Sequence, residues 1–325
     1  MVLHTRVRRF MDIRKERYRS VSRLRIKNRT REILWSILRA FFLLGFCFVI
    51  LYPMLLVLSK AFMERGDLYD RSVFLIPKHF TLDNIRTAAA QLHYTTTLWN
   101  SVWVATLVTV LQTASCLLVG YGFARFEFRF KKILFFLVIF TLIVPPQLTM
   151  LSSYLQFQYF DVFGIIKLLR GESLNLMGNA APLLMMAATC MGLKNGLFIY
   201  MLRQVFRGMP RETEEAAYVD GAGTFRTFWN IMLPGALSTV ITVMLFSFVW
   251  QWNDTTYSSI FYPQIPTLAN QLYGMVFTSM GSGATLASAI LESPKFFLLI
   301  TPVVILYLIT QKFFVQSIAR SGIVG

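Results

Sequence analysis

Charged residues are scarce in this sequence of 325 residues: Asp, Glu, Lys and Arg together make up 15% of it. Hydrophobic residues make up 55%, and the mean hydropathy is +0.55. A soluble domain of this length needs much more polar surface. The shortage of charge therefore excludes an ordinary soluble globular protein and indicates a chain that lies in a bilayer.

Cysteine and histidine are also scarce, with three of each. Cys47, Cys116 and Cys190 are too scattered for a metal site or a disulfide framework, so we interpret them as small buried apolar residues. The histidines have no ligand spacing, and the sequence contains neither a catalytic triad nor a glycine-rich phosphate loop. We therefore expect no enzyme, no catalytic residues, no metal and no cofactor bound by this chain itself.

What the sequence does contain is a series of uncharged runs, and a helix of about 20 apolar residues crosses a membrane. We expect an all-α polytopic membrane protein with six transmembrane helices, in chain order 34–62, 95–124, 133–154, 180–202, 234–257 and 295–315. Pro145 and Pro146 lie inside the third run, and the stretch 192–196 (Gly-Leu-Lys-Asn-Gly) interrupts the fourth. Backbone groups freed by such breaks must be satisfied by neighbouring helices or in a polar cavity.

Positive charge is concentrated at one end of the chain. Twelve of the 32 Lys and Arg residues lie between Arg6 and Arg31, directly before the first run. Such a segment could bind nucleic acid, but its position favours a topology signal that holds this side in the cytoplasm next to anionic membrane lipid. We expect residues 1–33 to be a basic cytoplasmic extension, residues 34–325 to be the transmembrane domain, both termini to be cytoplasmic, and no nucleic acid to be bound.

The most specific motif lies in the expected cytoplasmic loop, about residues 203–233. It reads Glu-Ala-Ala, three residues, Gly, nine residues, Ile-x-Leu-Pro, and begins at Glu215. Pro210 can open a short helix, acidic residues suit its first turn, and Gly221 lets the chain turn. The motif resembles the loop by which permeases of ABC importers dock on a separate ATPase. This resemblance implies a set of ATPase-coupling residues: Glu214, Glu215, Ala216, Ala217, Asp220, Gly221, Ala222, Leu233 and Pro234.

Further stretches at 81–84, 100–101, 121–126, 144–147 and 250–254 make the chain similar to one branch, the maltose-permease-like, binding-protein-dependent carbohydrate-uptake family, in its smaller second permease type. The resemblance implies a type I ABC importer permease fold in the inner (cytoplasmic) membrane, moving an oligosaccharide by alternating access. It also implies several partners: a second, unlike permease subunit, two cytoplasmic ATPase subunits that hold ATP and Mg, and an extracytoplasmic sugar-binding protein.

Three other functions stay open at this point. A permease for polyamines, phosphate or amino acids shares the loop motif but not the whole set of stretches. A membrane-bound enzyme would need convergent catalytic residues within the spans, and a structural scaffold would not need the motif at Glu215.

A mixture of aromatic, amide and charged residues suits a sugar, which presents hydroxyls and apolar faces. The candidate substrate path consists of Gln147, Lys194, Trp250, Trp252, Asn253, Asp254 and Tyr257. Other roles are open for these residues. Asp254 and Asn253 could cap the fifth span, tryptophan and tyrosine collect at membrane interfaces, and Lys194 could line a polar cavity, pair with Asp254 or snorkel.

Overall fold

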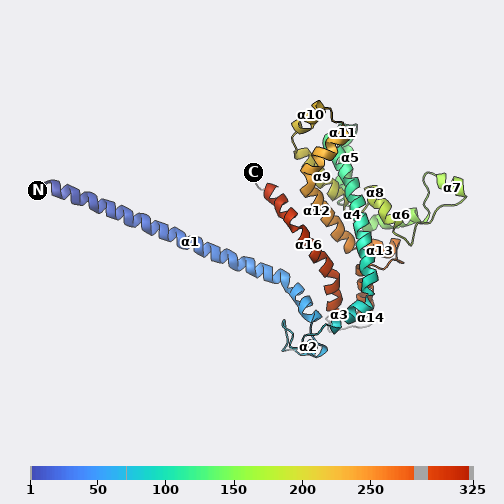
Figure 1. Ribbon diagram of the computed structural model, residues 1–325, viewed down its shortest axis with the longest axis horizontal. Helices are drawn as coiled ribbons and strands as arrows, with labels where there is room; N and C mark the ends of the chain where they lie inside the picture. Colours follow the sequence, from blue (N-terminus) through green and yellow to red (C-terminus); the bar gives the residue numbers. More distant parts are fainter. Residues whose placement is uncertain (1, 71, 282–291, 322–325) are drawn as a thin grey trace.

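The computed structural model describes residues 2–70, 72–281 and 292–321, without the side chains of 2–30, 65, 69, 279–281 and 313–321. Its elements are helices, listed in chain order: α1 (Val2–Ala61), α2 (Arg65–Tyr69), α3 (Asp83–Gln91), α4 (Tyr94–Arg125), α5 (Lys131–Phe140), α6 (Pro146–Gln158), α7 (Ile165–Arg170), α8 (Ala181–Ala188), α9 (Asn195–Gly208), α10 (Glu212–Val219), α11 (Thr224–Thr227), the π-helix η1 (Phe228–Met232), α12 (Leu233–Trp252), α13 (Thr256–Phe261), α14 (Leu268–Gly281) and α16 (Ser293–Ser321). The expectation of an all-α chain is confirmed (Figure 1). The last four residues of the expected cytoplasmic tail, 322–325, lie outside the described residues.

Four helices in the described ranges are long and apolar enough to cross a membrane. They are 31–61 within α1, α4, the continuous run Thr224–Trp252 through α11, η1 and α12, and Ser293–Lys312 within α16. These correspond to the first, second, fifth and sixth expected spans. The hydrophobic composition of each run was therefore sufficient to predict it, since a long helix satisfies its own backbone groups in lipid.

The third and fourth expected spans are each broken into two shorter helices. In the third, the chain leaves α5 after Phe140 and re-enters a helix at Pro146, where a missing N–H costs nothing in the first turn. In the fourth, six residues separate α8 from α9, and two of them, Cys190 and Lys194, adopt left-handed backbone conformations with φ of 59° and 61°. Residues other than glycine rarely adopt this backbone conformation. The two irregular spans that the sequence predicted are thus confirmed as breaks.

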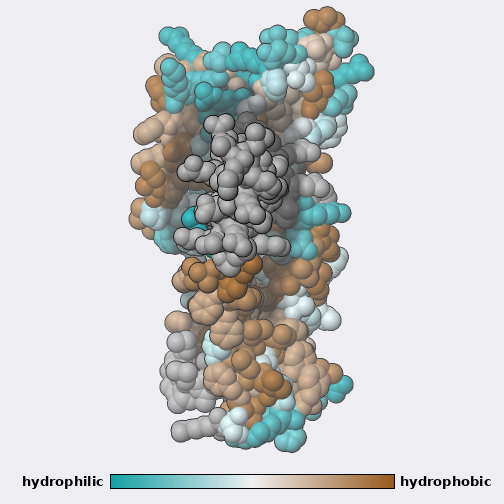
Figure 2. Space-filling view, turned by 90° about the vertical axis from the view of Figure 1, so that its left-hand side faces the viewer, coloured by the Kyte–Doolittle hydropathy of each residue, from teal (hydrophilic) through white to brown (hydrophobic). Residues whose placement is uncertain are grey.

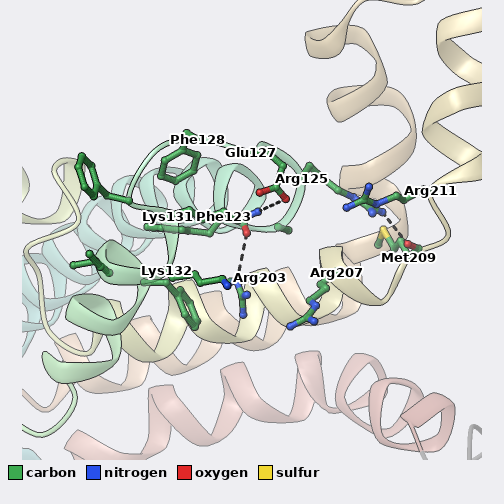
Figure 3. A pocket seen from close by; sticks show the side chains of 14 residues that line it. Phe123, Arg125, Glu127, Phe128, Lys131, Lys132, Arg203, Arg207, Met209 and Arg211 are labelled. Carbon is green, nitrogen blue, oxygen red and sulfur yellow. Dashed lines mark hydrogen bonds and ion pairs between the residues drawn. The ribbon is translucent and has the colours of Figure 1, made fainter.

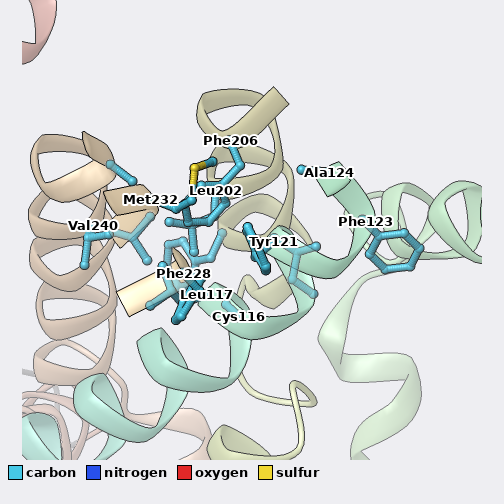
Figure 4. Close-up of a cluster of buried hydrophobic side chains, with 14 residues drawn as sticks. Cys116, Leu117, Tyr121, Phe123, Ala124, Leu202, Phe206, Phe228, Met232 and Val240 are labelled. Carbon is cyan, nitrogen blue, oxygen red and sulfur yellow. The ribbon is translucent and has the colours of Figure 1, made fainter. Parts of the chain in front are cut away.

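Helix α4 is at the centre of the bundle, with α8, α9 and α12 packed against it. A glycine allows the closest approach: a Cβ at Gly120 would lie 2.9 Å from the Cβ of Leu202 on α9. Small residues are common where membrane helices meet. Around this crossing a cluster of buried side chains, among them Tyr121, Phe206 and Phe228, joins α4, α9 and η1 (Figure 4).

Helix α1 differs from the rest because it leaves the bundle as one unbroken helix (Figure 1). The predicted boundary at residue 33 is not marked by any break in it. The most apolar 18 residues within its segment 31–61 include no buried residue, although the end of α1 packs against α16. Figure 2 shows hydrophilic residues at the two ends of the molecule and hydrophobic ones on the flanks between them. Such an exposed apolar flank suits a bilayer or another membrane subunit.

Candidate functional site

Helix α10 carries the loop motif and lies at one end of the bundle (Figure 1). It begins two residues after Pro210, and three glutamates, Glu212, Glu214 and Glu215, occupy its first turn, where the helix dipole favours negative charge. It ends at Val219, and two residues later Gly221 turns the chain with a φ of +81°, a left-handed conformation that glycine adopts without strain. The turn is closed by Ala222, whose N–H donates to the carbonyl of Ala217 at 2.9 Å.

Glu214 points into the protein, with 7% of its surface exposed. Its Oε1 accepts a hydrogen bond from the Tyr121 hydroxyl at 3.1 Å and lies 3.3 Å from Nε of Arg125. Arg125 also donates from Nη2 to the carbonyl of Met209, just before α10, at 2.9 Å. A buried carboxylate needs such a partner because its desolvation is costly. The carboxylate and the guanidinium therefore fix α10 to the end of α4.

The opposite side of α10 faces outward. Glu215, Ala216, Asp220 and Gly221 are exposed, whereas Ala217 is buried beside Glu214. Val219 is 87% exposed at the end of the helix. Beyond it, the rings of Phe225 and Trp229 stack with their centroids 6.3 Å apart while both remain exposed. The α10 turn thus presents a surface of small, acidic and apolar side chains that no other described part of the chain covers.

Two of the predicted coupling residues lie apart from this turn. Leu233 and Pro234 begin α12, directly after the π-helix η1, which starts at Phe228 and includes the last three residues of the nine-residue spacer of the motif. Single turns of π-helix inside longer helices are frequent at functional sites. The other seven predicted coupling residues, 214–217 and 220–222, lie together in α10 and its turn.

A cavity of about 490 Å³ lies between the two broken spans. The break around Pro145 and Pro146 forms one wall, the break at 190–196 forms another, and Tyr257 from α13 completes it. Its polar lining comes from hydroxyls, one side-chain amide and the charge of Lys194: Thr141, Thr149, Ser153, Lys194, Asn195 and Tyr257. Strained backbone clusters at functional sites, and the left-handed Lys194 stands in this wall.

Of the predicted substrate-path residues, the structure brings three together. Lys194 and Tyr257 line the cavity, and Nζ of Lys194 lies 6.0 Å from the ring centroid of Trp250. A cation above an indole face is attracted by the ring quadrupole. The alternative that Lys194 lines a polar cavity therefore agrees with the structure, and its pairing with Asp254 is not formed.

The remaining four predicted residues lie elsewhere. Gln147 is exposed and is absent from the cavity lining. Trp252 is 2% exposed and donates from Nε1 to the carbonyl of Leu299 at 3.1 Å. Asn253 is exposed and bonds back to the carbonyl of Val249 at 2.8 Å. The buried carboxylate of Asp254 accepts the backbone N–H groups of Tyr257 and Ser258 at 3.1 and 2.8 Å, so it caps the first turn of α13.

Sequence reasoning missed a polar network beside the cavity. Gln112 on α4 donates from Nε2 to the carbonyl of Leu193 at 2.6 Å and to the side-chain oxygen of Asn195, and it accepts from Ser247 on α12 at 2.5 Å. Its signal was an amide inside an otherwise apolar run, because such groups are expensive in lipid unless they are bonded. Arg125 was also missed as a partner of the loop, although it was part of a recognised stretch.

Comparisons with known proteins point to one family. Residues 116–319 match the family described as binding-protein-dependent transport system inner membrane component. The chain is 28% identical over 222 residues to the diacetylchitobiose uptake system permease protein of Streptomyces coelicolor, covering 68% of this chain and 64% of that protein, slightly less than two thirds. It is 25% identical over 314 residues to the arabinooligosaccharides transport system permease protein of Halalkalibacterium halodurans, covering 92% and 100%.

A solved structure has the same fold. The crystal structure of a bacterial ABC transporter involved in the import of the acidic polysaccharide alginate contains a chain that matches with a TM-score of 0.65 at 19% identity, over 86% of this chain and 96% of that one.

Proposed function

The chain belongs to the family of binding-protein-dependent transport system inner membrane components, and we propose that it is the permease subunit of an ATP-driven importer of an oligosaccharide. Family membership makes it a multi-pass membrane protein that transports rather than catalyses. The sugar assignment is supported by the relatives named for diacetylchitobiose and arabinooligosaccharide uptake.

The observation that carries this proposal is the bonded joint between α10 and the membrane helices. The buried contacts of Glu214 with Arg125 and Tyr121 connect an exposed docking surface to α4, the central helix of the bundle. A force applied to the exposed face of Glu215 and Ala216 would therefore reach the helices beside the cavity. An importer needs an element with two conformations, whose equilibrium can be shifted both by the ATPase at the docking surface and by the substrate at the cavity.

We assign the transport path to the cavity between the broken spans. Hydroxyl groups there suit sugar hydroxyls, Tyr257 and the nearby Trp250 offer apolar faces, and Lys194 supplies a donor. Discontinuous membrane helices are typical of substrate sites because their unwound backbone lines a cavity.

The remaining components follow from this role. Two cytoplasmic ATPase subunits hold ATP and Mg²⁺, one of them docking on α10 and its turn, and an extracytoplasmic binding protein delivers the sugar. A second, unlike permease covers part of the exposed apolar flank of α1. Residues 1–33 and both termini lie on the cytoplasmic side, the same side as α10, because positive charge is retained there.

The test is the ATPase activity of the assembled transporter, stimulated by the binding protein and its sugar. Glu215→Lys should abolish the stimulation and the uptake, because it reverses a charge on the exposed face of α10. The matched control is Glu172→Lys, an exposed glutamate near α7, which should leave both unchanged. Full stimulation with Glu215→Lys would refute the coupling role, and stimulation only by a non-sugar solute would refute the sugar assignment.

A further inference from the structure

A second cavity, of about 940 Å³, lies near the end of the bundle that carries α10, away from the transport cavity. The segment that joins α4 to α5 forms one side of it, and the end of α9 forms the other. Figure 3 shows Lys131 and Lys132 extending from the first side and Arg203 and Arg207 from α9. Neither the coupling contacts nor the transport path accounts for this cavity.

The charge of this cavity is strongly positive. Six basic side chains line it, against a single carboxylate: Arg125, Lys131, Lys132, Arg203, Arg207 and Arg211 face Glu127. Arg125 is committed to Glu214, and Lys131 is bonded to Glu127 at 3.0 Å. Among the described residues, Lys132, Arg203 and Arg207 form no ion pair. A concave surface lined by one sign of charge attracts a ligand of the other sign.

Arg203 is held in place without an acidic partner. Its guanidinium carbon lies 3.9 Å from the ring centroid of Phe135, and its Nε donates to the carbonyl of Phe123 at 3.4 Å. Stacking on an aromatic ring fixes the plane of the guanidinium while its outer N–H groups stay available. A pre-positioned guanidinium fork matches two oxygens of a phosphate.

The rest of the lining is apolar, and it continues beyond the cavity. Phe128, Phe130 and Ile133 are exposed around the basic residues, and further along α5 Phe136 is 65% exposed and Leu137 is exposed as well. A small soluble anion would make no contact with this apolar extension. An amphiphile would bind with its charged head among the arginines and its chains along α5.

We propose that this cavity binds the phosphate headgroup of an anionic phospholipid of the adjacent leaflet. Arg203, Arg207 and Lys132 bind the phosphate oxygens, and Phe128, Ile133 and Phe136 contact the glycerol and acyl chains. Basic pockets between membrane helices on the cytoplasmic side are suited to anionic headgroups. Arg211 also lines the cavity and lies one residue before α10, so the bound lipid would touch the segment that supports the docking surface.

The test measures lipid that stays bound to the assembled transporter, which keeps it independent of the proposed transport function. The complex is reconstituted in phosphatidylcholine nanodiscs with increasing phosphatidylglycerol, and bound lipid is counted by native mass spectrometry. The double variant Arg203→Gln/Arg207→Gln should weaken phosphatidylglycerol binding about 25-fold, since each basic residue near an anionic lipid contributes about fivefold. Lys132→Gln alone, at an exposed side chain, should weaken it about fivefold and guards against misfolding of the double variant.

The matched control is Lys167→Gln/Arg170→Gln on the exposed helix α7, which removes the same charge far from the cavity and should leave binding unchanged. Equal loss of lipid in the control, or no loss in the cavity variants, would overturn the proposal. Displacement of phosphatidylglycerol by soluble glycerol phosphate would show that the cavity binds a free phosphate, and it would overturn the proposal of a lipid site. Protection of the cavity by a partner subunit, seen as cross-linking through Lys132 in the complex, would also overturn it.

Discussion

Two buried carboxylates flank the continuous helical run Thr224–Trp252, one before it and one after it, and they are stabilised in different ways. Glu214 lies at the α10 end, where its partners Tyr121 and Arg125 come from a helix about ninety residues earlier in the chain. Asp254 lies just past the other end of α12 and is bonded to backbone N–H groups three and four residues later. One carboxylate joins two distant elements, whereas the other shapes a single turn.

Glu214 therefore acts as a joint, a contact that holds two distant elements together, whereas Asp254 acts as a helix cap. A long-range charged pair fails completely when either partner is lost, because the remaining charge stays buried and unpaired. A local cap can be replaced by water or by a neighbouring acceptor at lower cost. The Gln112 network is intermediate, since it joins three helices without a formal charge.

The largest effect is expected from Glu214→Gln compared with Glu215→Gln. The first change leaves Arg125 buried without its counter-charge, at a cost of about 3–5 kcal/mol, whereas the second alters an exposed side chain. Hydrogen exchange of residues 209–223 in the assembled transporter should therefore increase strongly for Glu214→Gln and little for Glu215→Gln. Equal exchange in the two variants would contradict the assignment of Glu214 as the joint.

A double variant sharpens this result. Arg125→Gln combined with Glu214→Gln removes both charges, so part of the protection should return relative to either single change. If the losses of protection in the two single variants simply added up, the two side chains would act independently. The contact between α10 and α4 would then depend on the Tyr121 hydroxyl alone.

The next effect concerns the uncharged network. Gln112→Leu leaves Ser247 and the carbonyl of Leu193 without their partner, and interhelical hydrogen bonds in membranes contribute about 0.6–1.7 kcal/mol each. We expect a loss of about 2 kcal/mol, measured as a lower thermal unfolding temperature of the complex. Ser247→Ala removes one of these bonds and should cost less than half as much. A cost for Ser247→Ala equal to that of Gln112→Leu would show that the amide is not the centre of the network.

The cap at Asp254 should be cheaper to remove. Asp254→Ala should cost about 1 kcal/mol, the usual cost of losing a cap, whereas Asp254→Asn keeps an acceptor and should be close to neutral in the unfolding temperature. Sugar-stimulated ATPase should survive both changes, since the carboxylate is occupied by backbone groups. A loss of stimulation in Asp254→Asn at unchanged stability would instead return Asp254 to the substrate path.

The sequence predicted what depends on local composition and little that depends on distant partners. Uncharged runs predicted the four continuous spans, and the prolines and glycines predicted both breaks, because these features act on the residues beside them. The inward turn of Glu214 was not predictable. Three glutamates occupy one turn of an eight-residue helix, and the choice between them is made by Arg125, far away in sequence. The role of Asp254 was likewise left open between a cap and a sugar contact.

The smallest effect belongs to a third carboxylate, in the expected outside loop. Asp67 accepts the backbone N–H of His79 at 2.7 Å, and its other oxygen lies 3.0 Å from Nδ1 of the exposed His79 ring. The His79 backbone bond lowers the pKa of Asp67, and the hydrogen bond to Asp67 raises the pKa of His79. Asp67 thus accepts a backbone N–H, as Asp254 does, and also contacts a basic side chain from another segment, as Glu214 does. Because the His79 ring is exposed, the pair tests whether exposure weakens such a contact.

The sign of the pH dependence follows from these two shifts. The raised pKa of His79 gives the loop stability that is complete below its unfolded value of about 6.5 and is lost as the pH rises through the folded value. The lowered pKa of Asp67 gives stability that is present above its unfolded value of about 3.9 and is lost as the pH falls. Protection of residues 63–80 from hydrogen exchange should therefore be greatest in mild acid and decrease above neutrality.

His79→Gln should remove the decrease on the alkaline side, and Asp83→Asn, in an exposed pair with Arg86, should leave the profile unchanged. The effect should be small, because solvent screens an exposed ring. If protection from hydrogen exchange changed with pH as steeply as expected for a buried ion pair, exposure would not weaken the pair. Sequence separation of the two partners, and not their burial, would then determine how much the contact stabilises the structure.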